Sequence, residues 1–149
     1  MSDEVRYYAR AVEGRRERSC ACEACRAMCR VPCWPTPDEA RRLIRAGHAD
    51  DLEIVDYEGQ GEILAPVDET TLFDHVLGTA SGCVFWDESG DCRLHRRGLK
   101  PLEGRLAHHS ITSARTGRQV RASIAWLWAQ PRGRAVIRRW WKVTKGSER

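Results

Sequence analysis

The chain has 149 residues, a length that suits one domain with a real hydrophobic core. Hydrophobic residues make up 42% of it and charged residues 31%, so the composition predicts a globular chain rather than a disordered one. The N-terminal residues lack the apolar core of a secretory signal, and no apolar run approaches the length of a membrane span. We therefore expect a cytoplasmic protein, without a membrane partner, whose thiols stay reduced.

The charges are unevenly distributed along the chain. Residues 46–92 contain no Lys or Arg and twelve acidic residues, whereas residues 93–149 contain fifteen Lys or Arg and two acidic residues. Two interpretations remain open. Either the acidic middle and the basic C-terminal third face each other in the fold, or the basic third meets an acidic partner such as nucleic acid.

The pattern predicts one domain with three parts. Residues 1–19 are expected to form an N-terminal helix, mainly over residues 3–18, where an apolar stripe recurs at helical spacing. Residues 20–109 are the cysteine-cluster core. Residues 110–149 are basic and rich in tryptophan, and they are expected to form the C-terminal helices.

Five of the seven cysteines lie between Cys20 and Cys33. In a reducing compartment such a cluster is typical of metal ligands, with redox thiols and buried structural cysteines as the alternatives. Cys20 is the expected bystander, because only one residue separates it from the next cysteine. The candidate metal ligands are Cys22, Cys25, Cys29, Cys33, Cys83, Cys92 and, as an additional donor, His95.

A helix is expected directly after the cluster. Thr36 is placed as its N-cap, Pro37 as its first residue and Glu39 as the partner of the cap, and Gly47 is the expected stop. Two short strands are predicted next, at residues 52–55 and 62–65, with a turn between them.

Residues 82–95 predict a second hairpin, in which Cys83 and Cys92 lie opposite each other about an Asp-Glu-Ser-Gly turn. Two facing cysteines would hold an ion from one side while the cysteine loop holds it from the other. Residues 96–118 are expected to be irregular. Helices are predicted over residues 119–130 and 134–145, with Trp128 and Trp141 at the spacing of core residues.

The expected fold is therefore a small, irregular α+β domain stabilised by metal. A cysteine loop and a short β-hairpin surround the metal, and helices pack outside. Zinc and a [4Fe–4S] cluster both remain open, since each takes four ligands and thiolates suit both. Six cysteine candidates exceed the needs of one zinc ion. The surplus fits a cluster with spare thiols, two zinc ions that share ligands, or one site with bystanders.

The chain resembles the CxxCxxCC family of bacterial cysteine-cluster proteins, described as zinc- or iron-chelating domains. The resemblance covers roughly residues 20–109. It is carried by Cys22, Cys25 and Cys29, by Thr36-Pro37-Asp38-Glu39-Ala40, by Cys83-Val84-Phe85, by Cys92-Arg93-Leu94-His95 and by Leu99-Lys100-Pro101-Leu102-Glu103-Gly104-Arg105. It implies a metal-chelating module whose biochemical role is poorly defined.

The chain departs from the family in two places. Adjacent cysteines are common in the family, whereas here Met28 precedes Cys29 and the next cysteine is Cys33. The family often has Cys-Arg after its Arg-Pro or Lys-Pro step, whereas Glu103-Gly104-Arg105 stands here. A ligand supplied by that last cysteine is therefore missing.

Three classes of function remain open. The first is a metal-binding module with a structural or accessory role and no catalysis of its own. The second is a nucleic-acid-binding or metal- or redox-sensing regulatory protein that uses its basic, Trp-rich C-terminus. The third is an iron–sulfur or zinc enzyme, although the chain contains no phosphate loop or dinucleotide fingerprint. The sequence identifies no catalytic residue and no specific protein partner.

Overall fold

The computed structural model describes residues 22–28, 32–56, 61–67, 83–86, 92–94, 97–101, 103–104 and 114–149. The helices are α2 (Glu23–Met28), α3 (Pro37–Arg45), α6 (Ala114–Ala129) and α7 (Pro131–Lys145), with the 3₁₀ helix η1 (Ala49–Asp51). The strands are β1 (Glu53–Asp56) and β2 (Glu62–Ala65). This mixture of helices and an antiparallel strand pair agrees with the expected α+β class. The helix predicted over residues 3–18 lies outside the described residues.

Helix α3 forms where its local signals place it. Thr36 Oγ1 accepts a hydrogen bond from the backbone N–H of Glu39, and Glu39 Oε1 accepts one from the backbone N–H of Thr36, so the predicted capping box is confirmed. Pro37 begins the helix, and the chain leaves it through Gly47 at a φ of 92°, which a residue with a side chain rarely adopts. Leu43 and Ile44 are buried on its inner face.

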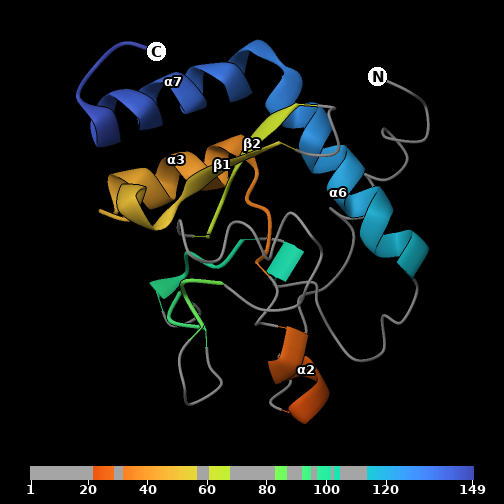
Figure 1. The fold of residues 1–149 in the computed structure, drawn as a ribbon. Helices are drawn as coiled ribbons and strands as arrows, with labels where there is room; N and C mark the ends of the chain where they lie inside the picture. The colour runs from red at the N-terminus through yellow and green to blue at the C-terminus, as the bar shows by residue number, and fades with distance from the viewer. Residues whose placement is uncertain are drawn as a thin grey trace.

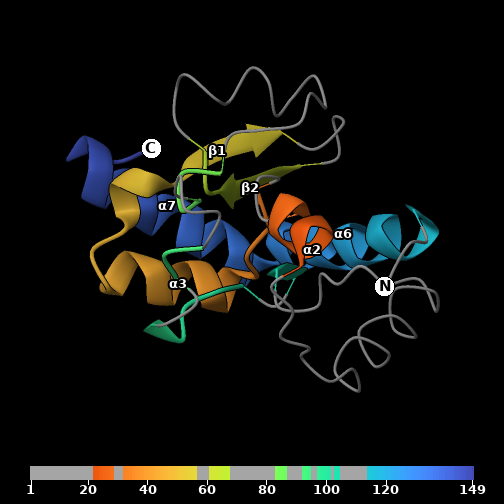
Figure 2. The same cartoon turned by 90° about the horizontal axis from the view of Figure 1, so that it is seen from below.

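Strands β1 and β2 form an antiparallel pair in which Glu53 lies opposite Ala65 and Asp56 opposite Glu62. Their bounds lie within one residue of the prediction. β2 is the more deeply covered strand, because α6 and α7 both pack against it. Figures 1 and 2 show α3 and the strand pair beside α7, and Figure 1 shows α2 at the opposite end of the molecule.

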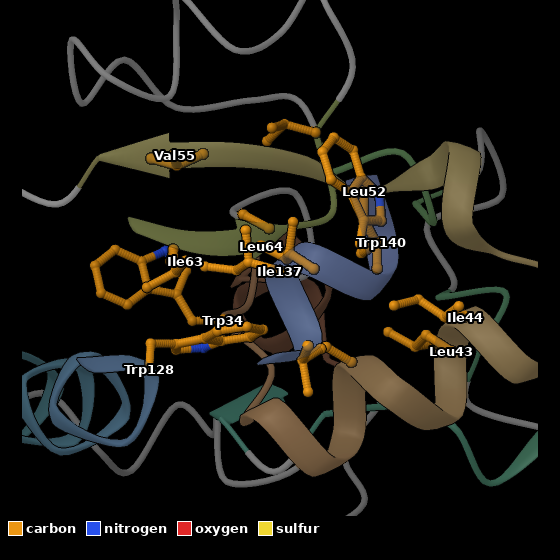
Figure 3. Close-up of a cluster of buried hydrophobic side chains, with 14 of the residues drawn as sticks. Trp34, Leu43, Ile44, Leu52, Val55, Ile63, Leu64, Trp128, Ile137 and Trp140 are labelled. Carbon is orange, nitrogen blue, oxygen red and sulfur yellow. The ribbon is translucent and has the colours of Figure 1, made fainter. Parts of the chain in front are cut away.

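The hydrophobic core lies between α3, α6, α7 and the strand pair. Figure 3 shows its side chains turned toward one another from these elements. The buried aromatic members are Trp34, Phe85, Trp128 and Trp140, and aliphatic side chains of α3, the strands and α7 fill the space around them. The core therefore joins the segment that leaves the cysteine cluster to the C-terminal helices.

Two tryptophans fasten the C-terminal helices to earlier parts of the chain. Trp128 Nε1 donates a hydrogen bond of 2.9 Å to the carbonyl oxygen of Pro35, and Trp140 Nε1 donates one of 2.8 Å to that of Ala49. Both indole rings are almost fully buried. Of the two tryptophans predicted at core spacing, Trp128 is buried, whereas Trp141 is only partly buried against the core and its neighbour Trp140 is almost fully buried. The contact with η1 determines which of the two adjacent residues faces inward.

Helix α6 begins earlier than predicted. Residues 114–118 were expected to be irregular, and the structure places them in α6. The helix runs through Gly117 although an interior glycine costs about 1 kcal/mol relative to alanine. Contacts of α6 with α7 and β2 outweigh that local cost. None of the described helices combines the length and the apolar character that a bilayer crossing requires.

Replacing Gly133 by alanine is expected to lower the free energy of unfolding by about 3 kcal/mol, the upper end of the usual cost of overpacking. Gly133 lies in the first turn of α7, where a Cβ atom would stand 2.4 Å from the carbonyl oxygen of Trp128. A glycine-to-alanine change in an exposed helix interior normally raises the free energy of unfolding by about 1 kcal/mol. The effect expected at Gly133 has the opposite sign. Urea-induced unfolding followed by circular dichroism measures the change.

A second glycine supplies the control. Gly146 has a φ of 69° and open space where a Cβ would lie, so Gly146→Ala is expected to cost only about 1 kcal/mol for the left-handed backbone. Equal losses in the two variants, or a gain for Gly133→Ala, would contradict a tight crossing of α6 and α7 at Gly133.

Candidate metal centre

Cys33 lies in the extended segment between α2 and α3. Burial raises the pKa of its thiol well above the ordinary value, and the neighbouring Cys83 is the next largest cause. Glu103 and Cys92 raise the same pKa further, and Lys100 opposes them. Cys83 and Cys92 therefore lie near the Cys33 thiol, although fifty and fifty-nine residues of sequence separate them from it.

Cys83 and Cys92 come from two short segments that run side by side. Trp86 and Cys92 form an isolated antiparallel bridge, and the N–H of Arg93 donates a hydrogen bond of 2.8 Å to the carbonyl oxygen of Phe85. The N–H of Val84 donates to the carbonyl oxygen of Pro66, which ties this unit to the end of β2. Both cysteines are partly buried and pack against the core.

The predicted register of this hairpin was wrong. Cys92 lies opposite Trp86 and not opposite Cys83. The physical reason is a turn at residues 83–86, in which the carbonyl oxygen of Cys83 accepts a hydrogen bond from the N–H of Trp86. The chain therefore bends at Cys83 where a strand was expected. Cys83 and Cys92 still reach the same region, since both act on the pKa of Cys33.

Gly104 lies directly against the Cys33 thiol. A Cβ atom at Gly104 would stand 3.2 Å from Cys33 Sγ and 3.0 Å from Lys100 Cε. These distances are tighter than ordinary van der Waals contact, so only glycine lets the backbone approach the sulfur this closely. The turn at residues 103–104 is thus one wall of the thiol region.

Glu103 and Arg121 hold the chain on either side of Cys33. Glu103 Oε1 accepts hydrogen bonds from the backbone N–H of Trp34 and from Arg121 Nη2, each at 3.2 Å. Arg121 Nη2 also donates to the carbonyl oxygen of Pro32 at 3.1 Å, and the guanidinium lies 4.4 Å from the centre of the Trp34 ring. Residues 32 and 34 are therefore fixed by a helix that begins eighty residues later.

Burial dominates the electrostatics of Glu103. It raises the pKa of the carboxyl group above the ordinary value of 4.5, although the Arg121 charge and the two hydrogen bonds lower it. Oε2 is buried and has no hydrogen-bond partner among the described residues. Sequence reasoning named Glu103 only as part of the motif that carries the family resemblance, and it gave Arg121 no role. The available signal was that Glu103 is one of only two acidic residues in the basic C-terminal third.

Cys22 and Cys25 form a second pair of sulfur atoms at the start of α2. Cys22 Sγ accepts a hydrogen bond of 3.5 Å from the backbone N–H of Cys25. Cys25 is buried and Cys22 is exposed. The two cysteines are three residues apart in one turn of the chain, and this C-x-x-C spacing is the one with which two thiolates bind a single ion.

The described residues do not by themselves form a complete metal site. Within the described ranges, no group of three or more His, Cys, Asp or Glu residues is arranged to hold a metal ion. Two predicted ligands, Cys29 and His95, lie outside those ranges, as does the expected bystander Cys20. None of the five described cysteines is joined in a disulfide.

Comparison with known proteins adds no assignment: no family model, no curated protein and no solved structure matches this chain. The resemblance to the CxxCxxCC family therefore stays a prediction that rests on the sequence motifs alone.

Proposed function

We propose that this chain is a metal-binding protein that carries zinc or an iron–sulfur cluster, and that Cys33, Cys83 and Cys92 contribute thiolate ligands together with residues of the first cluster. The observation that supports the proposal is that Cys83 and Cys92, from another part of the chain, both lie near enough to Cys33 to raise the pKa of its thiol. A single cysteine packed against the core is an ordinary small core residue. Two further thiols beside it are harder to explain by packing.

The donor chemistry fits a soft metal. Burial and neighbouring thiols disfavour the thiolate at Cys33, and a carboxylate nearby adds to the cost. A bound cation reverses this balance, because a metal ion deprotonates the thiols that coordinate it. Zinc and iron–sulfur clusters are the usual occupants of sites made of thiolates.

Further ligands would come from the first cluster. Three sulfur atoms leave at least one position to fill in a four-ligand site. Cys22 and Cys25 are the described candidates, and Cys29 and His95 are those predicted from the sequence. We assign the site a structural or accessory role, in which the metal joins α2, the segment at Cys33 and the unit at residues 83–94.

The proposal predicts that metal content depends on cysteines far from the first cluster. Protein purified anaerobically should contain zinc by elemental analysis, or iron with a broad visible absorption band. Cys33→Ser, Cys83→Ser and Cys92→Ser should each lose most of that metal, because removing one thiolate typically opens a four-ligand site. Circular dichroism should show the helices retained.

Cys20→Ser is the matched control, since it removes a thiol that we place outside the site. It should keep the metal content of the parent protein. A parent protein free of metal after anaerobic purification would overturn the proposal. So would Cys83→Ser and Cys92→Ser variants with full metal content, which would confine the site to the first cluster.

A further inference from the structure

Helix α7 carries a row of positive charges on the side facing away from the core. Its buried residues are Gly133, Val136, Ile137 and Trp140. At 100° per residue, the opposite side is centred near residue 142. Four exposed basic residues lie on it at i, i+4, i+8 and i+11, and we call them the basic stripe: Arg134, Arg138, Lys142 and Lys145.

The basic stripe keeps most of its charge. Its only carboxylate partner among the described residues is Glu148, which lies 3.8 Å from Lys142 with both side chains largely exposed. Such a pair is worth little in solution. Arg134 donates to the carbonyl oxygen of Ala129, which is neutral and cancels no charge.

Other basic residues of the same region are used within the fold. Arg132 pairs with Asp38 of α3 at 2.8 Å, and Arg149 pairs with Glu62 of β2. The basic third therefore meets one acidic residue of α3, Asp38, and one of the acidic middle of the chain, Glu62. The outward side of α7 takes no part in these contacts within the described part of the chain.

The fold holds the stripe in a fixed arrangement. The Trp140 indole anchors α7 to η1, and α7 packs on α3, α6 and β2. Lys145 Nζ lies 5.7 Å and 5.8 Å from the ring centres of Trp140 and Trp141, so its ammonium group is held beside two aromatic rings. At a rise of 1.5 Å per residue the stripe is about 16 Å long.

We propose that the basic stripe binds the phosphate backbone of nucleic acid. One strand of a duplex presents a charge every 3.4 Å along the axis, so about five phosphates span the length of the stripe. Arg and Lys in this arrangement supply charge without sequence preference. The inference does not rest on the metal site, since α7 is anchored through a Trp140 contact that involves no cysteine.

Two other acidic partners fit the surface less well. A helix that lies on a membrane inserts an apolar side into the lipid, whereas the apolar side of α7 is consumed by the core and leaves only Val143 largely exposed. Binding to a protein partner typically depends on an apolar or aromatic anchor residue at the centre of the interface, which the stripe lacks. Binding to the phosphodiester backbone of nucleic acid requires only the spaced charges.

Fluorescence anisotropy of the full chain with a short labelled duplex of mixed sequence tests the inference. If all four charges contact phosphates, log Kobs should fall with log salt at a slope of about −3.6, which is about a hundredfold between 50 and 200 mM. Arg138→Gln with Lys142→Gln should reduce that slope by about two. Both residues are exposed, so the fold should be unaffected.

Arg42→Gln with Arg45→Gln is the control, because it removes the same charge from exposed positions of α3. It should retain the slope of the parent protein. No binding to duplex or single strands at low salt would overturn the inference, and so would equal losses in the two double variants, which would indicate net charge alone. Binding to anionic vesicles in preference to nucleic acid would also overturn it.

Discussion

Arg121→Met is expected to lower the free energy of unfolding at neutral pH by about 2 kcal/mol, less than the loss of a fully buried ion pair, because the Arg121 and Glu103 side chains are 27% and 17% exposed. The change leaves the Glu103 carboxylate in its largely buried position without its cation. Glu103 Oε2 already has no hydrogen-bond partner among the described residues, so the structure offers little to replace the lost contact. Methionine retains the apolar stem that covers Trp34. Urea unfolding measures the loss.

Glu103→Gln in the Arg121→Met background separates charge from packing. The double variant has no buried charge to compensate, so it should recover at least half of the lost stability. A double variant as unstable as Arg121→Met alone would show that the guanidinium acts by packing on Trp34 and bonding Pro32, and would contradict the electrostatic explanation.

The pH dependence of Arg121→Met gives an independent check. Removing Arg121 takes away the largest influence that lowers the Glu103 pKa, so that pKa rises further. A carboxyl group with a raised pKa binds its proton more tightly in the folded state, so stability is lost as pH rises from 4.5 through the folded pKa. The free energy of unfolding that Arg121→Met loses relative to the parent protein should therefore be smaller at pH 5 than at pH 8.

The same contacts explain which parts of the fold the sequence could predict. Helix α3 was placed correctly because its signals, Thr36, Pro37 and Glu39, lie within four residues of one another. The strands were placed within one residue for the same reason. The sequence did not show which of Trp140 and Trp141 faces inward, because the inward direction of Trp140 depends on a hydrogen bond to Ala49, ninety-one residues away. Local periodicity cannot distinguish adjacent tryptophans on a helix with a narrow buried side.

In the region around Cys33, too, local features could be predicted from the sequence and long-range contacts could not. Its cysteines were identified from their spacing and from the compartment expected of the chain. The residues that position them, Gly104, Glu103 and Arg121, act across long sequence distances, and no local pattern in the sequence shows these contacts. The turn at Cys83 was missed because the predicted pairing of Cys83 with Cys92 rested on their equal spacing from a Gly-containing turn. Equal spacing predicts which residues pair only if both flanking segments are strands. Here a hydrogen bond between Cys83 and Trp86 bends one of them.

Removing the metal should loosen one part of the molecule selectively, if the proposed site is correct. Residues 83–86 and 92–94 are joined by one isolated bridge and few backbone hydrogen bonds, so a metal crosslink would supply much of their stability. We expect a chelator to speed amide hydrogen exchange at Val84 and Arg93 by about a hundredfold or more, for about 3 kcal/mol of lost protection. Returning the metal should restore it.

Helix α7 is the internal control for this experiment. Ile137 and Trp140 are buried against α3, η1 and β2 through contacts that use no thiol, so their amides should stay protected after chelation. Equal acceleration in α7 would mean that the metal maintains the whole fold, and unchanged exchange at Val84 would mean that no metal joins the cysteine segments. Selective loosening would show that the hydrophobic core folds the helices, while the metal fixes the segments that carry Cys83 and Cys92.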